Sequence, residues 1–173
     1  MKPTIDIIGR RGRFLLLFVA GIASLALIFS QWQPFFDRAY LYPVSWMATS
    51  LLDLIGIGTR LDADPLPLGF CLMVFETTTF RVIHECTGIF ALLIFAAALF
   101  AYPAPIKQKL RGLLLGLPAF FAYSALRLVI LGLVAHFQPT WIHFFHLYLM
   151  VLLNLGFLIF IWSIWVKGAL RHD

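Results

Sequence analysis

Four long apolar stretches restrict the fold of this chain more than any other feature. A transmembrane helix needs ~20 apolar residues to cross ~30 Å of hydrocarbon, and the two shorter stretches would need flanking residues or a locally thinned bilayer. Hydrophobic residues make up 62% of the chain and charged residues only 12%, which excludes a soluble globular enzyme, a disordered chain and a disulfide scaffold. We predict a single membrane domain over 1–173, an all-α integral membrane bundle with about four spans at 14–30, 88–102, 112–136 and 141–166.

Basic residues cluster in three places, and these clusters predict the orientation in the membrane. Loops rich in Lys and Arg stay in the cytoplasm, and four spans would place all three clusters on that side. We therefore expect both termini in the cytoplasm and segment 31–87 outside. The net charge of +5 then reflects membrane orientation rather than nucleic-acid binding. The clusters are Arg10, Arg11 and Arg13; Lys107, Lys109 and Arg111; and Lys167 and Arg171.

The first span also has features of a signal peptide, because a basic segment precedes its apolar core. Residues 10–15 loosely resemble a twin-arginine signal. No small-x-small cleavage site follows the core near Gln31. We interpret the stretch as an uncleaved anchor and keep a cleaved signal as the alternative.

The outer segment 31–87 contains more than a loop. Apolar residues recur at helical spacing over 44–57, with Ser45, Thr49 and Asp53 on the other face, which predicts an amphipathic helix at the outer interface. Residues 68–75 and 78–83 are rich in Phe, Val, Ile and Thr. We expect them to form a short β-hairpin that leads into the second span.

Arg127 is the charged residue that stands deep within a predicted span. An ionisable group inside a membrane is costly and marks a functional site by default, although a snorkelling anchor is the alternative. Tyr123 and Ser124, one turn earlier, could orient its guanidinium. His146 lies near the outer end of the next span, and His143 shares its helix face.

Cys86 lies where the predicted hairpin enters the second span. Polar neighbours, including Glu85, flank it, and Gly88 leaves the backbone open to a ligand. A nucleophilic thiol needs a pKa below its usual ~8.5, and Arg127 or a charged His146 could supply the positive charge. Topology would thus bring a thiol, a guanidinium and an imidazole to one side of the membrane, as a cysteine nucleophile with an acid–base partner and an oxyanion stabiliser requires.

Other readings of these residues are weaker. His84, Cys86, His143 and His146 could provide four metal ligands, but their spacing matches no usual site, so we expect no metal. A disulfide between Cys71 and Cys86 would silence the proposed nucleophile and stays open. No phosphate loop or nucleotide motif is present, and we expect no cofactor.

Three motifs in order resemble the exosortase and archaeosortase family. Residues 85–89, Glu-Cys-Thr-Gly-Ile, resemble its Cys-Ser/Thr-Gly-Ile signature. Residues 124–127, Ser-Ala-Leu-Arg, resemble its Asn-x-x-Arg motif, with Ser124 in the usual Asn position. Residues 145–148, Phe-His-Leu-Tyr, resemble the His motif of the next span. The resemblance covers roughly 44–166, and the short length is most similar to the small subfamily called exosortase H.

This resemblance implies a membrane cysteine transpeptidase in the bacterial inner membrane, with its active site on the periplasmic side. Such enzymes are thought to cut a C-terminal sorting signal, made of a short motif, a transmembrane helix and a basic tail, and to pass the new end to a surface acceptor. The match implies Cys86 as nucleophile, Arg127 as oxyanion or thiolate stabiliser and His146 as acid–base residue. The alternatives are an intramembrane protease that only hydrolyses and a non-catalytic assembly or transport subunit with Arg127 as helix glue.

Overall fold

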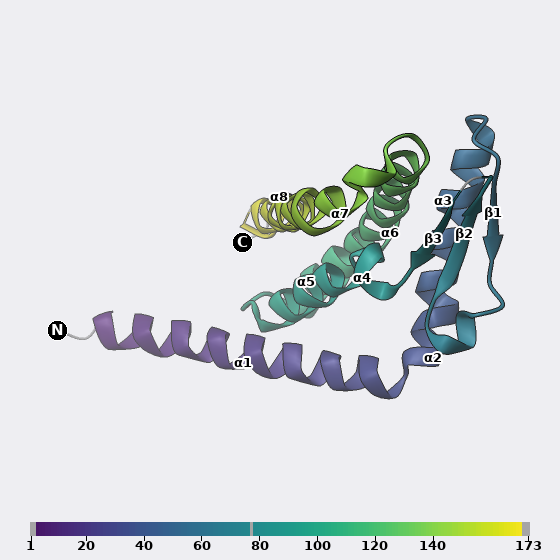
Figure 1. The fold of residues 1–173 in the computed structure, drawn as a ribbon. Coiled ribbons are helices and arrows are strands. Elements are labelled where there is room, and N and C mark those ends of the chain that lie inside the picture. Colours follow the sequence, from purple (N-terminus) through teal and green to yellow (C-terminus); the bar gives the residue numbers. More distant parts are fainter. Residues whose placement is uncertain (1–2, 77, 171–173) are drawn as a thin grey trace.

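A computed structural model describes residues 3–76 and 78–170 of the chain. Thr77, in the predicted hairpin turn, and Arg171, in the last basic cluster, lie outside them. The fold is mostly helical with one small sheet (Figure 1). Its elements are α1 (Pro3–Gln31), α2 (Gln33–Phe36), the π-helical η1 (Asp37–Leu41), α3 (Tyr42–Leu54), β1 (Thr59–Asp62), the 3-10 turn η2 (Leu66–Leu68), β2 (Cys71–Phe75), β3 (Thr79–Val82), α4 (His84–Thr87), α5 (Ile89–Ala101), α6 (Ile106–Phe137), the 3-10 turn η3 (Pro139–Trp141), α7 (Ile142–Phe144), the π-helical η4 (Phe145–Leu149) and α8 (Met150–Leu170).

Within the described residues, three helical segments are long and apolar enough to cross a membrane. They are Gly12–Gln31, Ile106–Phe137 and Pro139–Ala169, and they match three of the four predicted spans. The fourth, α5, is apolar but has only 13 residues, which corresponds to about 20 Å of helix against ~30 Å of hydrocarbon. The chain is thus a multi-pass membrane protein, and a fourth span at α5 stays a prediction.

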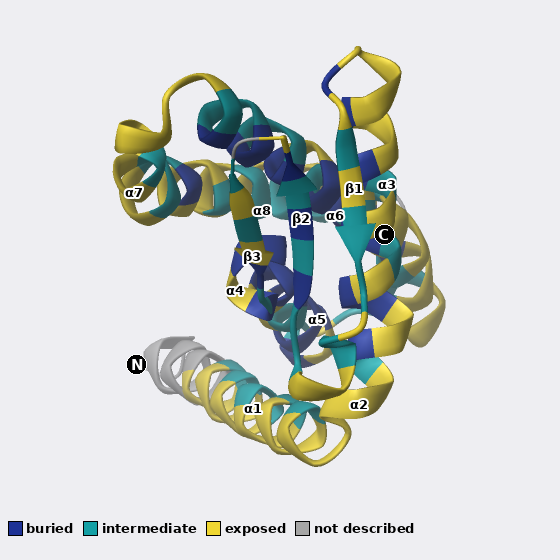
Figure 2. Ribbon diagram, turned by 45° about the vertical axis from the view of Figure 1, so that its right-hand side comes forward, coloured by how far each residue is buried: buried dark blue, intermediate teal, exposed yellow. Residues whose placement is uncertain are grey.

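Helix α5 is the centre of the helical part. It lies along α1 and also packs against α6 and α8 (Figure 1). A β-carbon on Gly21 of α1 would lie 3.5 Å from Cβ of Ala97 in α5, so small residues allow these two helices to approach closely. The described side chains of α1 are otherwise largely exposed, as Figure 2 shows, which fits a helix surrounded by lipid.

Segment 31–87 contains α3 and a three-stranded antiparallel sheet in the order β1-β2-β3. The predicted helix and hairpin are both present, with Thr59 opposite Phe75 and Cys71 opposite Val82 in the register. Strand β1 is an addition, because its four residues carry no strand pattern of their own and pairing with β2 makes the strand.

The polar face predicted for α3 is partly wrong. Asp53 is exposed, but Ser45 and Thr49 are buried, because α3 packs against α6 and the sheet. The Thr59 hydroxyl donates a hydrogen bond of 3.0 Å to the Thr49 carbonyl, which ties α3 to β1.

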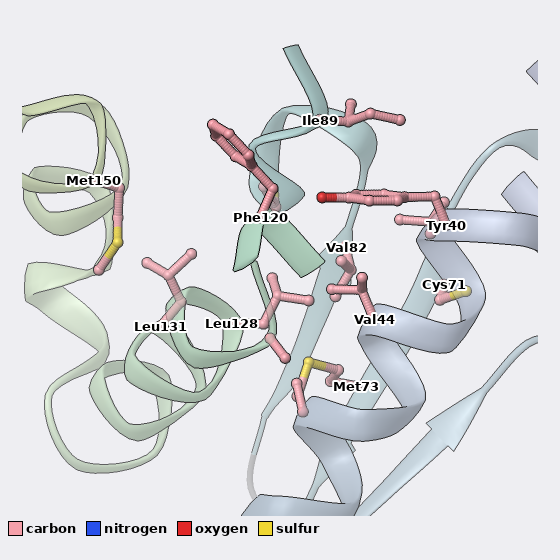
Figure 3. Close-up of a cluster of buried hydrophobic side chains, with 14 of the residues drawn as sticks. Tyr40, Val44, Cys71, Met73, Val82, Ile89, Phe120, Leu128, Leu131 and Met150 are labelled. Atoms are coloured by element: carbon pink, nitrogen blue, oxygen red, sulfur yellow. The ribbon is translucent and has the colours of Figure 1, made fainter. Parts of the chain in front are cut away.

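One part of the hydrophobic core lies between α3, β2 and the C-terminal half of α6. Figure 3 shows Val44, Met73 and Leu128 meeting from these three elements. A β-carbon on Gly132 would lie 2.6 Å from Cδ1 of Leu52, so this glycine lets α3 approach the backbone of α6. Burial of each large aliphatic side chain contributes roughly 1.5–3 kcal/mol. This core holds the part of α6 that carries Arg127 in a fixed place.

Candidate active site

One turn of helix, α4, carries Cys86 from the sheet into α5. The Cys86 amide donates to the Ile83 carbonyl at 3.0 Å, and the Thr87 hydroxyl donates to the His84 carbonyl at 2.7 Å. Gly88 ends the turn with φ +74°, a left-handed conformation that glycine adopts without steric cost. Cys86 is thereby held at the point where the outer segment meets the helices.

Gly88 is also a point of close approach for two polar side chains. A β-carbon at this residue would lie 3.1 Å from Oδ1 of Asn154 and 3.3 Å from Nη1 of Arg127. A side chain here would therefore press on both groups. The absence of a side chain lets Arg127 and Asn154 pack closely against the backbone two residues after Cys86.

The Cys86 thiol is buried, with 2% of the residue exposed. Burial raises its pKa above the ordinary value, and the Glu85 carboxylate raises the pKa further; the Ile83 backbone and the Arg127 charge lower the pKa without reversing the shift. From the sequence we expected a lowered pKa for the Cys86 thiol. The structure instead presents a protonated thiol, which has to lose its proton to a base during any reaction.

Arg127 lies on α6 and is only 4% exposed. Among the described residues no carboxylate forms an ion pair with it, and its Nε has no hydrogen-bond partner. Cys86 and Tyr123 are close enough to interact with its charge. A buried, uncompensated charge is unfavourable unless something negative or polar forms beside it.

Tyr123 and Ser124 have different surroundings. The Tyr123 ring stacks on Phe157 with centroids 4.1 Å apart, while its hydroxyl has no partner in the described structure. Ser124 donates to the Phe120 carbonyl at 2.7 Å, so its oxygen accepts the 2.8 Å hydrogen bond from Tyr40. Burial raises the pKa of Tyr40 to about 12, which keeps it a donor. Ser124 thus holds α6 to η1 and has no bond to Arg127.

His146 lies on η4 and is half-buried, with Nδ1 enclosed and without a partner in the described part of the chain. Arg127, Glu85 and His143 are all within electrostatic range of its ring. His143 and Glu85 are themselves exposed. Of the two histidines that the sequence singled out, His146 is the one enclosed near Arg127.

Sequence reasoning missed two features of this region. Asn154 was hidden among the apolar residues of the last span. The second feature is a buried pair, in which Nε2 of His84 lies 2.6 Å from Oδ1 of Asp37, with 5% and 3% of these residues exposed. This pair joins η1 to the first residue of α4. In the sequence, the signal was Asp37 beside an apolar stretch. Its partner His84 lies 47 positions away, and only the fold shows that the two meet.

The remaining thiol lies elsewhere. Cys71 is buried on β2, and both cysteines are free. Burial raises the pKa of Cys71 to about 11. No group of three or more His, Cys, Asp or Glu that could hold a metal ion occurs in the residues searched, which are those that the structure describes.

Comparison with known proteins identifies the family. The family model described as "Transmembrane exosortase (Exosortase_EpsH)" matches residues 6–167. No curated protein and no solved structure matched the chain. The family match spans α1 to α8 and includes Cys86, Arg127 and His146. The chain therefore belongs to the transmembrane exosortase family.

Proposed function

We propose that this chain is a cysteine transpeptidase that cleaves the C-terminal sorting signal of exported membrane-anchored proteins and transfers them to a surface acceptor. The observation that carries the proposal is the buried charge of Arg127, which has no acidic partner among the described residues and lies within electrostatic range of the Cys86 thiol. A fixed cation that faces a thiol is suited to a reaction in which negative charge develops beside it. Family membership supports a role in sorting.

The first half-reaction would form a thioester. The Cys86 sulfur attacks the scissile carbonyl while its proton passes to the imidazole of His146. Arg127 stabilises the oxyanion of the tetrahedral intermediate. As the C–N bond breaks, His146 returns the proton to the leaving amine, which departs with the C-terminal helix of the substrate. The raised pKa of Cys86 makes this transfer to His146 part of the attack, because little thiolate exists beforehand.

The second half-reaction would release the product. An amine or hydroxyl of the acceptor attacks the thioester, His146 removes its proton, and Cys86 leaves as the thiol. Water in the acceptor's place would give a free carboxylate, which is the hydrolytic alternative. The 2% exposure of Cys86 supports transfer, since an enclosed thioester meets little water.

We further propose that the protein lies in the bacterial inner membrane with its site on the periplasmic side. The basic clusters support this orientation. The two ends of the described chain lie at one end of the molecule in Figure 1, and α3 with the sheet lies at the other. That arrangement fits cytoplasmic termini and an outer face that bears α3.

The test is processing in cells that contain proteins ending in an apolar helix and an Arg-rich tail. Cys86→Ser should abolish removal of that tail, while Cys71→Ser, a change at the other buried cysteine, should retain it. Mass spectrometry of the new C-terminus then separates transfer from hydrolysis, because transfer adds the acceptor's mass and hydrolysis leaves a free carboxylate. Full processing by Cys86→Ser would refute the proposal.

A further inference from the structure

Asn154 is a polar residue in the otherwise apolar middle of α8, and the mechanism above does not use it. Its neighbours Leu153 and Leu155 are exposed, as expected for side chains in contact with lipid. Asn154 itself is half-buried, and its Oδ1 is enclosed without a hydrogen-bond partner in the described structure. A buried polar atom that lacks a partner is unfavourable and needs an explanation.

The position of this amide is specific. Its Oδ1 and Nη1 of Arg127 both lie within 3.3 Å of the point where Gly88 would carry a β-carbon. Gly88 follows Cys86 by two residues. The carboxamide and the guanidinium therefore both pack against the turn that bears the thiol.

Asn154 and His146 lie on consecutive helical elements, α8 and η4. Eight residues separate Asn154 from His146, and at 3.6 residues per turn this exceeds two turns by nearly one residue. His146 itself lies within the π-helical η4, Phe145–Leu149, so the interval between the two residues begins inside that turn. Positions i and i+8 belong to one stripe of a helix, so His146 and Asn154 face the same side of this segment.

The chemistry of the carboxamide indicates which group its unpartnered oxygen could bind. Its oxygen accepts one N–H group, and a peptide main chain offers such a donor at every residue except proline. Arg127 carries donors only, so it suits the oxyanion and cannot accept a main-chain N–H. An acceptor next to an oxyanion donor is complementary to a peptide whose carbonyl faces Arg127 and whose N–H faces Asn154.

We propose that Asn154 is a substrate-binding residue whose Oδ1 accepts a main-chain N–H from the segment beside the scissile bond. This inference rests on the proposed function, because it places the peptide relative to Cys86. It assigns the residue to recognition of extended peptide backbone, independent of side-chain sequence. Asn154 thus contributes binding, and Arg127 and His146 contribute to the chemical steps.

The test uses two alkylating probes of Cys86 that differ only in peptide character. Iodoacetamide is small, and iodoacetyl-Ala-Ala-amide carries two peptide groups. With either probe the Cys86 sulfur displaces iodide, an S–C bond forms, the C–I bond breaks, and the thiol proton passes to buffer. The full-length protein in proteoliposomes, in a Cys71→Ser background, leaves Cys86 as the single thiol.

For Asn154→Leu we expect KI of the peptide probe to rise about tenfold, equivalent to about 1.4 kcal/mol and within the range for one neutral hydrogen bond. The maximal labelling rate and the iodoacetamide rate should stay within about twofold. Ser163→Ala is the matched control, because Ser163 is polar on the same helix but bonds to its own Ile159 carbonyl at 2.7 Å. We expect this variant to leave KI unchanged.

Two results would overturn the assignment. An unchanged KI in Asn154→Leu would remove the residue from peptide binding. An equal slowing of both probes would make Asn154 a support for the fold or for Arg127. The proposed function is judged separately, since processing of membrane proteins by Cys86→Ala refutes it whatever the probes show.

Discussion

Replacement of Arg127 by Lys tests the oxyanion role most directly. Lys keeps the positive charge but loses the planar, forked donor set of the guanidinium. Its ammonium also ends one bond short of the position of Nη1, the atom that lies 3.3 Å from the β-carbon position of Gly88. If Arg127 stabilises an oxyanion beside Gly88, a lysine ammonium that does not reach the position of Nη1 cannot stabilise that oxyanion equally well.

The expected loss can be scaled from two effects. Removal of one oxyanion donor typically lowers the rate ~10²–10³-fold, or about 2.7–4 kcal/mol. A misplacement of about 1 Å alone can cost about 10²-fold. We therefore expect Arg127→Lys to lose roughly 10²-fold in processing rate, and Arg127→Ala to lose at least as much.

The assay is the ratio of processed to unprocessed substrate at matched membrane levels of each variant. Arg111→Lys is the matched control, because Arg111 lies on the same helix and is exposed, and we expect it to process substrate as the unmodified chain does. Near-normal processing by Arg127→Lys would refute the oxyanion role and leave at most a simple charge effect. Near-normal processing by Arg127→Ala would remove Arg127 from the site.

Four further predictions concern the thiols, Arg127 and the topology. Cys71→Ser should retain processing, because Cys71 lies on β2 outside the Arg127 environment. If Cys71→Ser abolished processing while Cys86→Ser retained it, the nucleophile would be Cys71 and not Cys86. The rate of Cys86 alkylation should be low at pH 7 and should still rise about tenfold per pH unit above pH 8.5, because burial raises the pKa of the thiol. Arg127→Ala should slow that alkylation further at fixed pH, since removing the cation raises the pKa again; a plateau already at pH 7 would contradict this reasoning. Reporter fusions should read as cytoplasmic at Gln108 and as external at Ala63, and a cytoplasmic signal at Ala63 would remove the periplasmic geometry of the site.

Much of the fold follows from local pattern. The three long apolar stretches correspond to α1, α6 and the segment that ends in α8, because length and hydropathy are properties of the chain itself. The enrichment of residues 68–75 and 78–83 in Phe, Val, Ile and Thr likewise predicts β2 and β3. Strand β1 carries no such pattern and exists through its register with β2, which no local signal encodes.

The candidate site divides in a similar way. Cys86, Arg127 and His146 are conspicuous in sequence because a thiol, a cation and an imidazole are unusual near apolar spans, although their catalytic roles stay predictions. The Asp37–His84 pair depends on a contact across 47 positions. Asn154 looks like an ordinary polar interruption until the fold places its Oδ1 3.1 Å from the β-carbon position of Gly88, beside Arg127.

Sequence alone therefore determined that the chain is a membrane protein and which residues could carry chemistry, because burial in lipid selects residue types one at a time. Only the tertiary structure decided which of them meet. The left-handed turn at Gly88, the close approach of α6 and α8 to it, and the protonated state of the enclosed Cys86 all arise from packing between distant segments. Packing of that kind depends on how helices are placed against one another, and a linear pattern of apolar and polar residues does not specify it.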